Sequence, residues 1–282
     1  MKTSLDHLPI RKQRQLAALV EEINAAVPVE MVILFGSHAR GDWVEDAVGG
    51  YFSDFDVLVI VKNAKTVERH DLWSSVEQRV ERHLGKTLLS LIVHDIADVN
   101  RQISLGQYFF SDIRREGIVL YDAGQVTLAE PMEKTPEERR AYARQNYEQW
   151  FESAEGFLEA YELMAARGRF KLAAFQLHQA TERFYTAALL VLTEYKPKAH
   201  NIDYLGKLAG KLAPSLRDVF PRTEREDKRL FDLLKKAYVD ARYSTKYAIT
   251  LEELRVLEGR VRDLRDRVEA LCRDRIAGDA EG

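Results

Sequence analysis

Two short motifs in the first quarter of the chain carry residue types that can do chemistry. Gly36-Ser37 directly follows the apolar run 31–35, and Asp54 and Asp56 stand at the start of a second apolar run. Side chains two residues apart on a strand point to the same side, so the two carboxylates are expected to converge. Converging carboxylates repel each other unless a hard cation takes their oxygens, and Mg²⁺ prefers one or two carboxylates together with substrate phosphates. The aspartates therefore predict a metal site that also takes a phosphorylated substrate.

The Gly-Ser pair has the properties of a phosphate-binding turn. Glycine allows close approach of the backbone, and the residues after it can open a helix whose N-terminal amides face an anion. Each motif alone has a plainer interpretation: Gly36-Ser37 is also an ordinary turn, and Ser53-Asp54-Phe55-Asp56 is also a strand cap. The combination favours phosphate at the turn and metal at the aspartates.

This stretch resembles the nucleotidyltransferase superfamily related to DNA polymerase beta, in its minimal bacterial form. The signature of that family is Gly-Ser-x-x-Arg-Gly followed by Asp-x-Asp, and the chain has Gly36-Ser37-His38-Ala39-Arg40-Gly41 and Asp54-Phe55-Asp56. The resemblance covers residues 8 to 122. It implies that Asp54 and Asp56 bind Mg²⁺ and that Gly36 and Ser37 anchor the triphosphate of an NTP, with ATP the expected donor. An acceptor hydroxyl would then attack the α-phosphorus while pyrophosphate leaves.

Several positions depart from the family pattern or allow two interpretations. Ser90 stands where the family often has a third carboxylate, and a hydroxyl is neither a carboxylate base nor a strong metal ligand. His94 shares a strand face with Ser90 and is either a base for the acceptor or a surface or loop-capping histidine. Arg40 either contacts phosphates or forms a salt bridge on a helix. The acidic, glycine-containing insert 42–52 predicts a mobile flap over the site.

The length and the hydrophobic pattern indicate two domains. With 282 residues, the chain exceeds the usual size of one core. The first domain, 1–126, is predicted as α/β or α+β with a mixed β-sheet. Its elements are a helix over 8–26, strands over 31–35, 55–61, 87–93 and 118–121, and a helix carrying Trp73, Val76, Val80 and Leu84. A linker is expected over 127–136.

The second domain, 137–274, is predicted as an all-α bundle, followed by a flexible tail at 275–282. Thr135, Pro136 and Glu138 form a capping-box pattern, and Thr250 with Glu253 forms another. Two long antiparallel helices and a long last helix are expected, with shorter segments at 201–213 and 227–241. The two long helices carry stripes of apolar residues, which are Tyr147, Trp150, Phe151, Ala154, Phe157, Leu158 and Tyr161 on the first and Phe170, Ala174, Leu177, Thr181, Phe184, Ala188 and Val191 on the second.

This half resembles the HEPN family of helical domains, which commonly accompany minimal nucleotidyltransferases. The resemblance rests on Gln179 and Glu182 in one helix, the Lys198-x-His200 turn and the segment 237–250. It implies an accompanying domain that shapes the acceptor side or forms a homodimer, to which the aromatic stripes would contribute.

Ribonuclease activity is not favoured by the spacing in this half. Many HEPN domains are ribonucleases that use an arginine followed after four to six residues by a histidine. The positions that this spacing permits after Arg242 hold Tyr247, Ala248 and Ile249. His178 is expected to be a hydrogen-bonded core or interface histidine. Lys196, Lys198 and His200 either contact nucleotide phosphates or belong to a solvated loop.

Composition restricts the remaining classes. Lys and Arg total 42 against 45 Asp and Glu, so a basic surface for nucleic acid is not indicated. The single cysteine, Cys272, excludes an intramolecular disulfide and is expected in the core. No stretch resembles a signal peptide or a membrane span, and a cytoplasmic protein is expected.

The function expected from the sequence is Mg²⁺-dependent transfer of an NMP group, with AMP expected, from an NTP to an acceptor. The acceptor is a small hydroxylated molecule or a protein side chain, as in toxin–antitoxin pairs of this family. The alternative is a nucleotide-binding module that has lost catalysis, which Ser90 and the long insert favour. An RNA-binding or RNA-cleaving protein is the third candidate.

Overall fold

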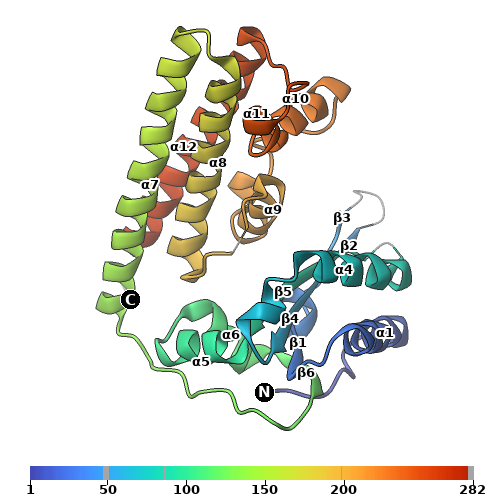
Figure 1. Ribbon diagram of the computed structural model, residues 1–282. Helices are drawn as coiled ribbons and strands as arrows, with labels where there is room; N and C mark the ends of the chain where they lie inside the picture. The colour runs from blue at the N-terminus through green and yellow to red at the C-terminus, as the bar shows by residue number, and fades with distance from the viewer. Residues whose placement is uncertain (47–50, 86, 198, 279–282) are drawn as a thin grey trace. The chain divides into compact units, whose positions relative to one another are not determined.

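The computed structural model describes residues 1–46, 51–85, 87–197 and 199–278 (Figure 1). The chain divides into two compact units, Met1–Glu133 and Lys134–Gly282. The predicted domains 1–126 and 137–274 each fall within one unit.

A four-stranded sheet of order β5-β4-β1-β6 forms the centre of the first unit. β1 (Met31–Phe35) pairs antiparallel with β4 (Phe55–Val61) and with β6 (Ile118–Asp122), whereas β4 pairs parallel with β5 (Leu89–Asp95). The predicted mixed sheet is therefore confirmed. The bounds of β1 and β4 agree with the prediction, and β5 begins two residues later than predicted.

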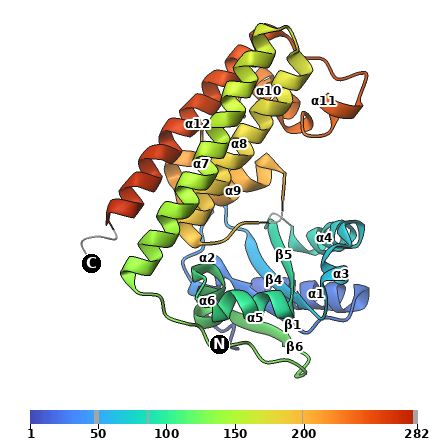
Figure 2. The same cartoon turned by 60° about the vertical axis from the view of Figure 1, so that its left-hand side comes forward.

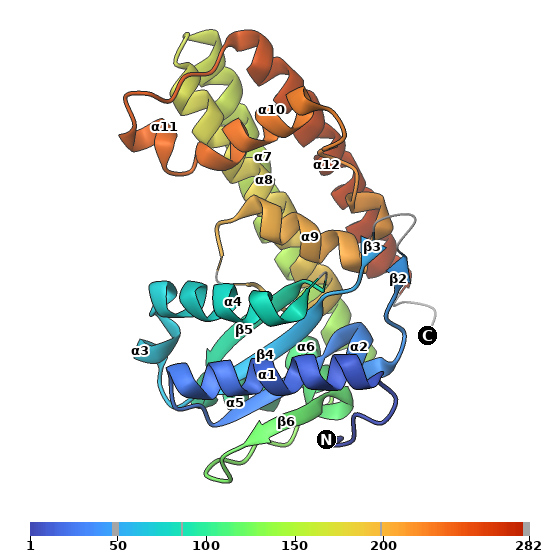
Figure 3. The same cartoon turned by 90° about the vertical axis from the view of Figure 1, so that its right-hand side faces the viewer.

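Helices cover the sheet because parallel strands need a long crossover connection. The connection from β4 to β5 contains α3 (Ala64–Val67) and α4 (His70–Leu84), and α4 packs against α1 (Ile10–Ala26) (Figure 3). The core between the two helices and the sheet contains the residues predicted for α4, which are Trp73, Val76, Val80 and Leu84, and Leu16, Leu19 and Ile23 of α1.

Two helices after β5 were not predicted. α5 (Ile96–Ser104) and α6 (Tyr108–Glu116) have nine residues each, too few for a clear apolar period. Asp95 begins α5 by accepting a hydrogen bond from the Asp98 backbone N–H at 2.9 Å. Within the insert, β2 (Glu45–Asp46) pairs with β3 (Tyr51–Phe52), and the tip of the predicted flap, 47–50, lies outside the described residues.

The second unit is a helical bundle, as predicted. α7 (Pro136–Ala166) and α8 (Phe170–Thr193) lie side by side along their lengths (Figure 2). They are followed by α9 (Ile202–Leu212), a 3-10 turn at Pro214–Leu216, α10 (Arg225–Lys236), α11 (Asp240–Tyr243) and α12 (Leu251–Gly278). α8 has the most buried residues and packs against α7, α9 and α12.

Both capping boxes of the second unit are present. At the start of α7, Thr135 Oγ1 accepts from the Glu138 N–H at 3.2 Å, and Glu138 accepts from the Thr135 N–H at 2.8 Å. Thr250 and Glu253 repeat the pattern before α12. At the other end of α12, residues 275–278 belong to the helix rather than to the predicted flexible tail, and 279–282 lie outside the described residues.

Part of the predicted aromatic surface is buried within the second unit itself. Phe151 and Phe184 lie in the core with ring centroids 5.2 Å apart, whereas Tyr147, Trp150 and Phe157 pack half-buried around it. Cys272 is fully buried, as expected, and burial raises the pKa of its thiol to about 12. In the described part of the chain, no helix has the length and apolarity to cross a membrane.

We expect Thr135→Ala to lower the free energy of unfolding of the second unit by about 1 kcal/mol, because it removes the N-cap acceptor of α7. Urea unfolding followed by circular dichroism measures the change. Thr223→Ala, at an exposed loop position, serves as the matched control. An equal effect of the two substitutions would contradict a role of the cap.

Candidate functional site

The register between β1 and β4 brings the Gly-Ser motif to the aspartates. Phe35, the last residue of β1, lies opposite Asp56, so the next residue, Gly36, lies against the Asp56 side chain. A Cβ at Gly36 would overlap the Asp56 carboxylate, and Gly36 has φ +71°, where residues with a side chain are strained. Both observations require glycine at this position.

The two aspartates alternate with a buried residue, as the strand pattern predicts. Phe55 is fully buried, whereas Asp54 and Asp56 are half-buried on either side of it. Ser90 of β5 pairs with Asp56 in the parallel register, so it occupies the position expected from the sequence. The Ser90 hydroxyl is buried and has no hydrogen-bond partner among the described residues. It adds a neutral oxygen beside Asp56 instead of a third carboxylate.

The helix that follows Gly36 is short. α2 (Gly36–Arg40) has five residues, and the Ser37 carbonyl accepts from the N–H groups of Gly41 and Asp42 at 2.9 and 3.1 Å. So short a helix adds little dipole, so anion binding here would depend on the local N–H groups of the turn. Arg40 Nε donates to Asp42 Oδ2 at 3.3 Å on the surface, which favours the salt-bridge interpretation of Arg40.

His38, the third residue of the Gly-Ser motif, joins it to the Asp-x-Asp motif. The side chain is fully buried, and Nδ1 donates to the Asp54 carbonyl oxygen at 2.9 Å. The ring stacks on Trp43 at 5.7 Å and packs on Phe55 at 4.6 Å. His38 therefore fixes the backbone of Asp54 from α2. Sequence reasoning assigned this residue no role, although it stands inside the motif.

A buried lysine, which the sequence did not reveal, holds the base of the insert. Lys12 Nζ donates to Thr87 Oγ1 at 2.8 Å and pairs with Glu45 Oε1 at 2.7 Å, and the Lys12 side chain is only 2% exposed. Arg11 also contacts Glu45, at 3.1 Å. The hydrogen bond from Lys12 lowers the pKa of Glu45, so this carboxylate is charged at neutral pH.

Burial keeps His38 neutral. It lowers the pKa of His38 to about 4, and the positive charge of Lys12 acts in the same direction, while Glu45 and Asp54 oppose it. A neutral ring with its proton on Nδ1 leaves Nε2 as an acceptor, and Nε2 has no partner among the described residues.

His94 lies too far along its strand to act on an acceptor beside the aspartates. It pairs with Ile60, four residues beyond Asp56, a distance of about 13 Å at the usual strand rise. The ring is buried, and Nδ1 donates to Asp98 at 2.8 Å, a bond that holds the pKa of Asp98 well below its usual range. The structural interpretation of His94 is the one that the geometry favours.

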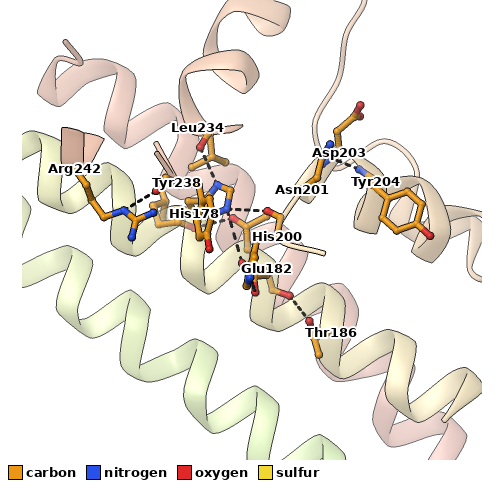
Figure 4. A network of polar contacts seen from close by, with 12 residues as sticks. His178, Glu182, Thr186, His200, Asn201, Asp203, Tyr204, Leu234, Tyr238 and Arg242 are labelled. Carbon is orange, nitrogen blue, oxygen red and sulfur yellow. Dashed lines mark hydrogen bonds and ion pairs between the residues drawn. The ribbon is translucent and has the colours of Figure 1, made fainter. Parts of the chain in front are cut away.

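In the second unit, His178 is a core histidine, as expected. It is fully buried, and Nδ1 donates to the Leu234 carbonyl oxygen at 3.0 Å (Figure 4). Nε2 faces the His200 carbonyl oxygen at 3.2 Å, and burial lowers the pKa of His178. The neutral ring therefore makes the shorter bond, and the second contact becomes a hydrogen bond only on protonation.

The other residues that the sequence indicated in this unit contact different parts of it. Lys196 lies over the Trp150 ring at 5.0 Å, and Lys198 is outside the described residues. Tyr247 is buried and its hydroxyl donates to the Leu233 carbonyl oxygen at 3.0 Å. The His200 side chain contacts the Glu182 carboxylate.

Comparison with known proteins divides the chain in the same way. Residues 16–88 match the family model of the nucleotidyltransferase domain, and residues 147–271 match that of the HEPN domain. No curated protein matches the chain. Among solved structures, a nucleotidyltransferase-like protein from Exiguobacterium sibiricum matches with 13% identity over 93% of this chain and 75% of its own, with a TM-score of 0.27.

We expect Gly36→Ala to destabilise the first unit more than Gly124→Ala. Gly124 has a similar φ of +69° but nothing within 4 Å of its Cβ position, so its substitution carries only the backbone strain of about 1 to 2 kcal/mol. Gly36→Ala adds the overlap with Asp56. The urea midpoints of the two variants give the difference in stability. Equal midpoints would show that a Cβ at position 36 does not overlap the Asp56 carboxylate.

The neutral state of His38 predicts an acid sensitivity of the first unit. As the pH falls from about 6.5 towards 4, the unfolded chain binds a proton at this ring before the folded chain does, so stability is lost. We expect the wild type to lose about 2 kcal/mol more than His38→Asn between pH 7 and pH 5. The asparagine keeps an N–H donor for the Asp54 carbonyl and does not titrate.

The measurement is urea unfolding followed by tryptophan fluorescence in a Trp150→Phe background, where only Trp43 and Trp73 report. Parallel losses in the two proteins would mean that His38 is already protonated at neutral pH or is not buried.

Proposed function

Since the chain is a nucleotidyltransferase domain followed by a C-terminal HEPN domain, we propose that it transfers an NMP group from an NTP, with ATP the expected donor, to an acceptor. Asp54 and Asp56 would hold Mg²⁺, and Gly36 and Ser37 would bind the triphosphate.

The observation that carries the proposal is the contact between Gly36 and Asp56. Two motifs separated by a long insert meet because β1 and β4 pair, and the missing side chain of Gly36 leaves room for the Asp56 carboxylate. If Gly36-Ser37 were only a turn, or Asp54 and Asp56 only a strand cap, neither motif would need to lie beside the other.

The donor set fits Mg²⁺. The described residues contain no group of three or more His, Cys, Asp and Glu side chains suited to a metal, so Asp54 and Asp56 would supply two carboxylates and the substrate the remaining oxygens. This is the ligand balance that Mg²⁺ prefers. The orphaned hydroxyl of Ser90 beside Asp56 gives the site one further neutral oxygen. When bound, the ion neutralises charge on the phosphate oxygens.

The residues of the chain would act by positioning. His38 holds the Asp54 backbone, β4 holds Asp56, and the N–H groups that follow β1 would bind the triphosphate. Neither Ser90 nor His94 suits the role of a base: Ser90 is a hydroxyl, and His94 lies about 13 Å along the strand. The reaction would depend on orientation and charge, as nucleotidyl transfer permits.

The acceptor is a small hydroxylated molecule or a protein side chain, and we propose a homodimer formed through the HEPN domain. The half-buried rings of Tyr147, Trp150 and Phe157 remain available for such a contact. Arg183 and Lys196 already lie over the Trp150 ring, at 4.7 and 5.0 Å, so this surface is partly cationic.

RNA cleavage by the second unit is the less favoured candidate. The first position permitted for a histidine after Arg242 holds Tyr247, which is buried, and Arg242 Nε donates to the Tyr238 carbonyl oxygen at 2.7 Å. Incubation of the protein with RNA in EDTA gives an independent check.

We expect Asp54→Asn and Asp56→Asn to abolish Mg²⁺-dependent ATP binding while the fold stays intact. Each substitution keeps the shape and removes one negative charge, so unfolding free energy should stay equal or rise slightly as repulsion is relieved. Asp71→Asn, at an exposed position of α4, is the matched control.

Calorimetric titration of Mg²⁺-ATP, thermal melts and a pyrophosphate-release assay together test this prediction. A strand cap predicts a loss of about 1 kcal/mol in stability and unchanged ATP affinity, which would remove the basis of the proposal. Binding without pyrophosphate release would favour the nucleotide-binding module.

A further inference from the structure

Ser90 and Asp56 lie on the same face of the sheet in the first unit. They are partners in the parallel pairing of β4 with β5, and paired residues on neighbouring strands point to the same side. Ring contacts identify this side. Phe35, the partner of Asp56 on β1, and His94, four residues after Ser90, both pack on aromatic rings of α6, at 5.5 and 5.1 Å. Ser90 therefore stands beside Asp56 on the side of the sheet that α6 covers.

The hydroxyl of Ser90 is buried and unpaired. Ser90 is 6% exposed, and its Oγ has no hydrogen-bond partner among the described residues. The large majority of buried polar side-chain atoms are bonded to protein or water, so an unpaired one indicates a water molecule, an ion or a ligand. His94, on the same strand face, is by contrast bonded to Asp98 at 2.8 Å. The Ser90 hydroxyl can therefore bond to a group that binds at Asp56.

The charge of the site suits one divalent cation. Two divalent ions in a catalytic site lie about 3.5 to 4 Å apart and repel each other, so both need carboxylates close by. Asp54 and Asp56 together carry the charge that balances one such ion. Ser90, the neighbour of Asp56 on β5, is neutral and adds no charge. Within the part of the chain that the structure describes, no group of three or more His, Cys, Asp and Glu side chains is suited to a metal.

We propose that the aspartates take a single divalent cation and that the Ser90 hydroxyl bonds to a water molecule of its hydration shell. The inference rests on the proposed function. Mg²⁺ keeps several waters when it is bound by one or two carboxylates and substrate phosphates. A serine hydroxyl both donates and accepts, so it suits a bond to such a water. Ser90 is then a positioning residue, and the type of residue at position 90 determines how many ions the site holds.

The plainer interpretation is that Ser90 is a small core residue with no part in ion binding. Ser90→Ala separates the two, because alanine fits the same space and removes the hydroxyl. The unfolding free energy should stay equal or rise, since a buried unpaired group is lost. A core role predicts unchanged affinity for the ion. The proposal predicts an affinity lower by about tenfold, as when other contacts to the surroundings of a metal are removed.

Ser90→Asp tests the number of ions directly. A carboxylate at position 90 would stand beside Asp56 and supply the charge that a second ion needs, so we expect this variant to bind a second ion. Ser74→Asp is the matched control. Ser74 is an exposed residue of α4, and the substitution adds the same charge away from the aspartates.

The experiment uses the full chain with Mn²⁺ in place of Mg²⁺ and with α,β-methylene-ATP, which lacks the bond that nucleotidyl transfer breaks. Equilibrium dialysis counts the Mn²⁺ bound per chain, and electron paramagnetic resonance distinguishes an isolated ion from a magnetically coupled pair. We expect an isolated ion in the wild type, Ser90→Ala and Ser74→Asp, and a coupled pair in Ser90→Asp. Thermal melts check that the variants fold.

The outcomes separate the inference from the proposed function. A coupled pair in the wild type, unchanged affinity in Ser90→Ala, or an isolated ion in a folded Ser90→Asp protein would overturn the inference and leave the proposed function standing. Equal Mn²⁺ binding by the wild type and Asp56→Asn would overturn both. If Ser90→Asp does not fold, the wild type and Ser90→Ala still decide.

Discussion

The antiparallel pairing of β1 with β4 is the constraint on which the first unit depends. It sets Phe35 opposite Asp56, and from that register follow the contact of Gly36 with the carboxylate and the placement of α2 over Phe55. A slip by one residue would turn every side chain of β4 to the opposite face and remove Asp56 from the turn. The buried side chains on both faces of β4 fix the register, so the core and the site are specified by the same residues.

The two units use carboxylates differently. Asp54 and Asp56 are half-buried on either side of Phe55, and in the proposed function they share a cation. Glu182 is buried, and the ring of His200 is its partner. The first pair has the character of a binding site, whereas the second resembles the carboxylate that orients a histidine in many catalytic groups. Neutral histidines serve as connectors in both units: His38 between two motifs and His178 between α8 and its neighbours.

Long apolar runs made most of the fold predictable. β1 and β4 are buried strands with the predicted bounds, and the capping boxes at Thr135 and Thr250 marked the starts of two long helices. α5 and α6 were missed because nine residues hold too few apolar positions for a period. At the site, the alternation of half-buried Asp54 and Asp56 with buried Phe55 follows from the strand pattern at the start of β4. The hydrogen bond from His38, the buried Lys12 and the stack of Tyr238 on His200 join distant segments, and no local pattern reports such contacts.

The contacts at the base of the insert fix the position of the aspartates independently of how long the insert is. Lys12 pairs with Glu45, Arg11 adds a second contact, and the backbone N–H of Ser53 donates to the Val44 carbonyl oxygen at 2.9 Å, so the two ends of the insert are held together where it leaves the sheet. Loop length adds little to the cost of closing a chain whose ends are already fixed. Evolution or design can therefore lengthen, shorten or exchange the segment beyond this base without moving Asp54, which makes the segment a replaceable module.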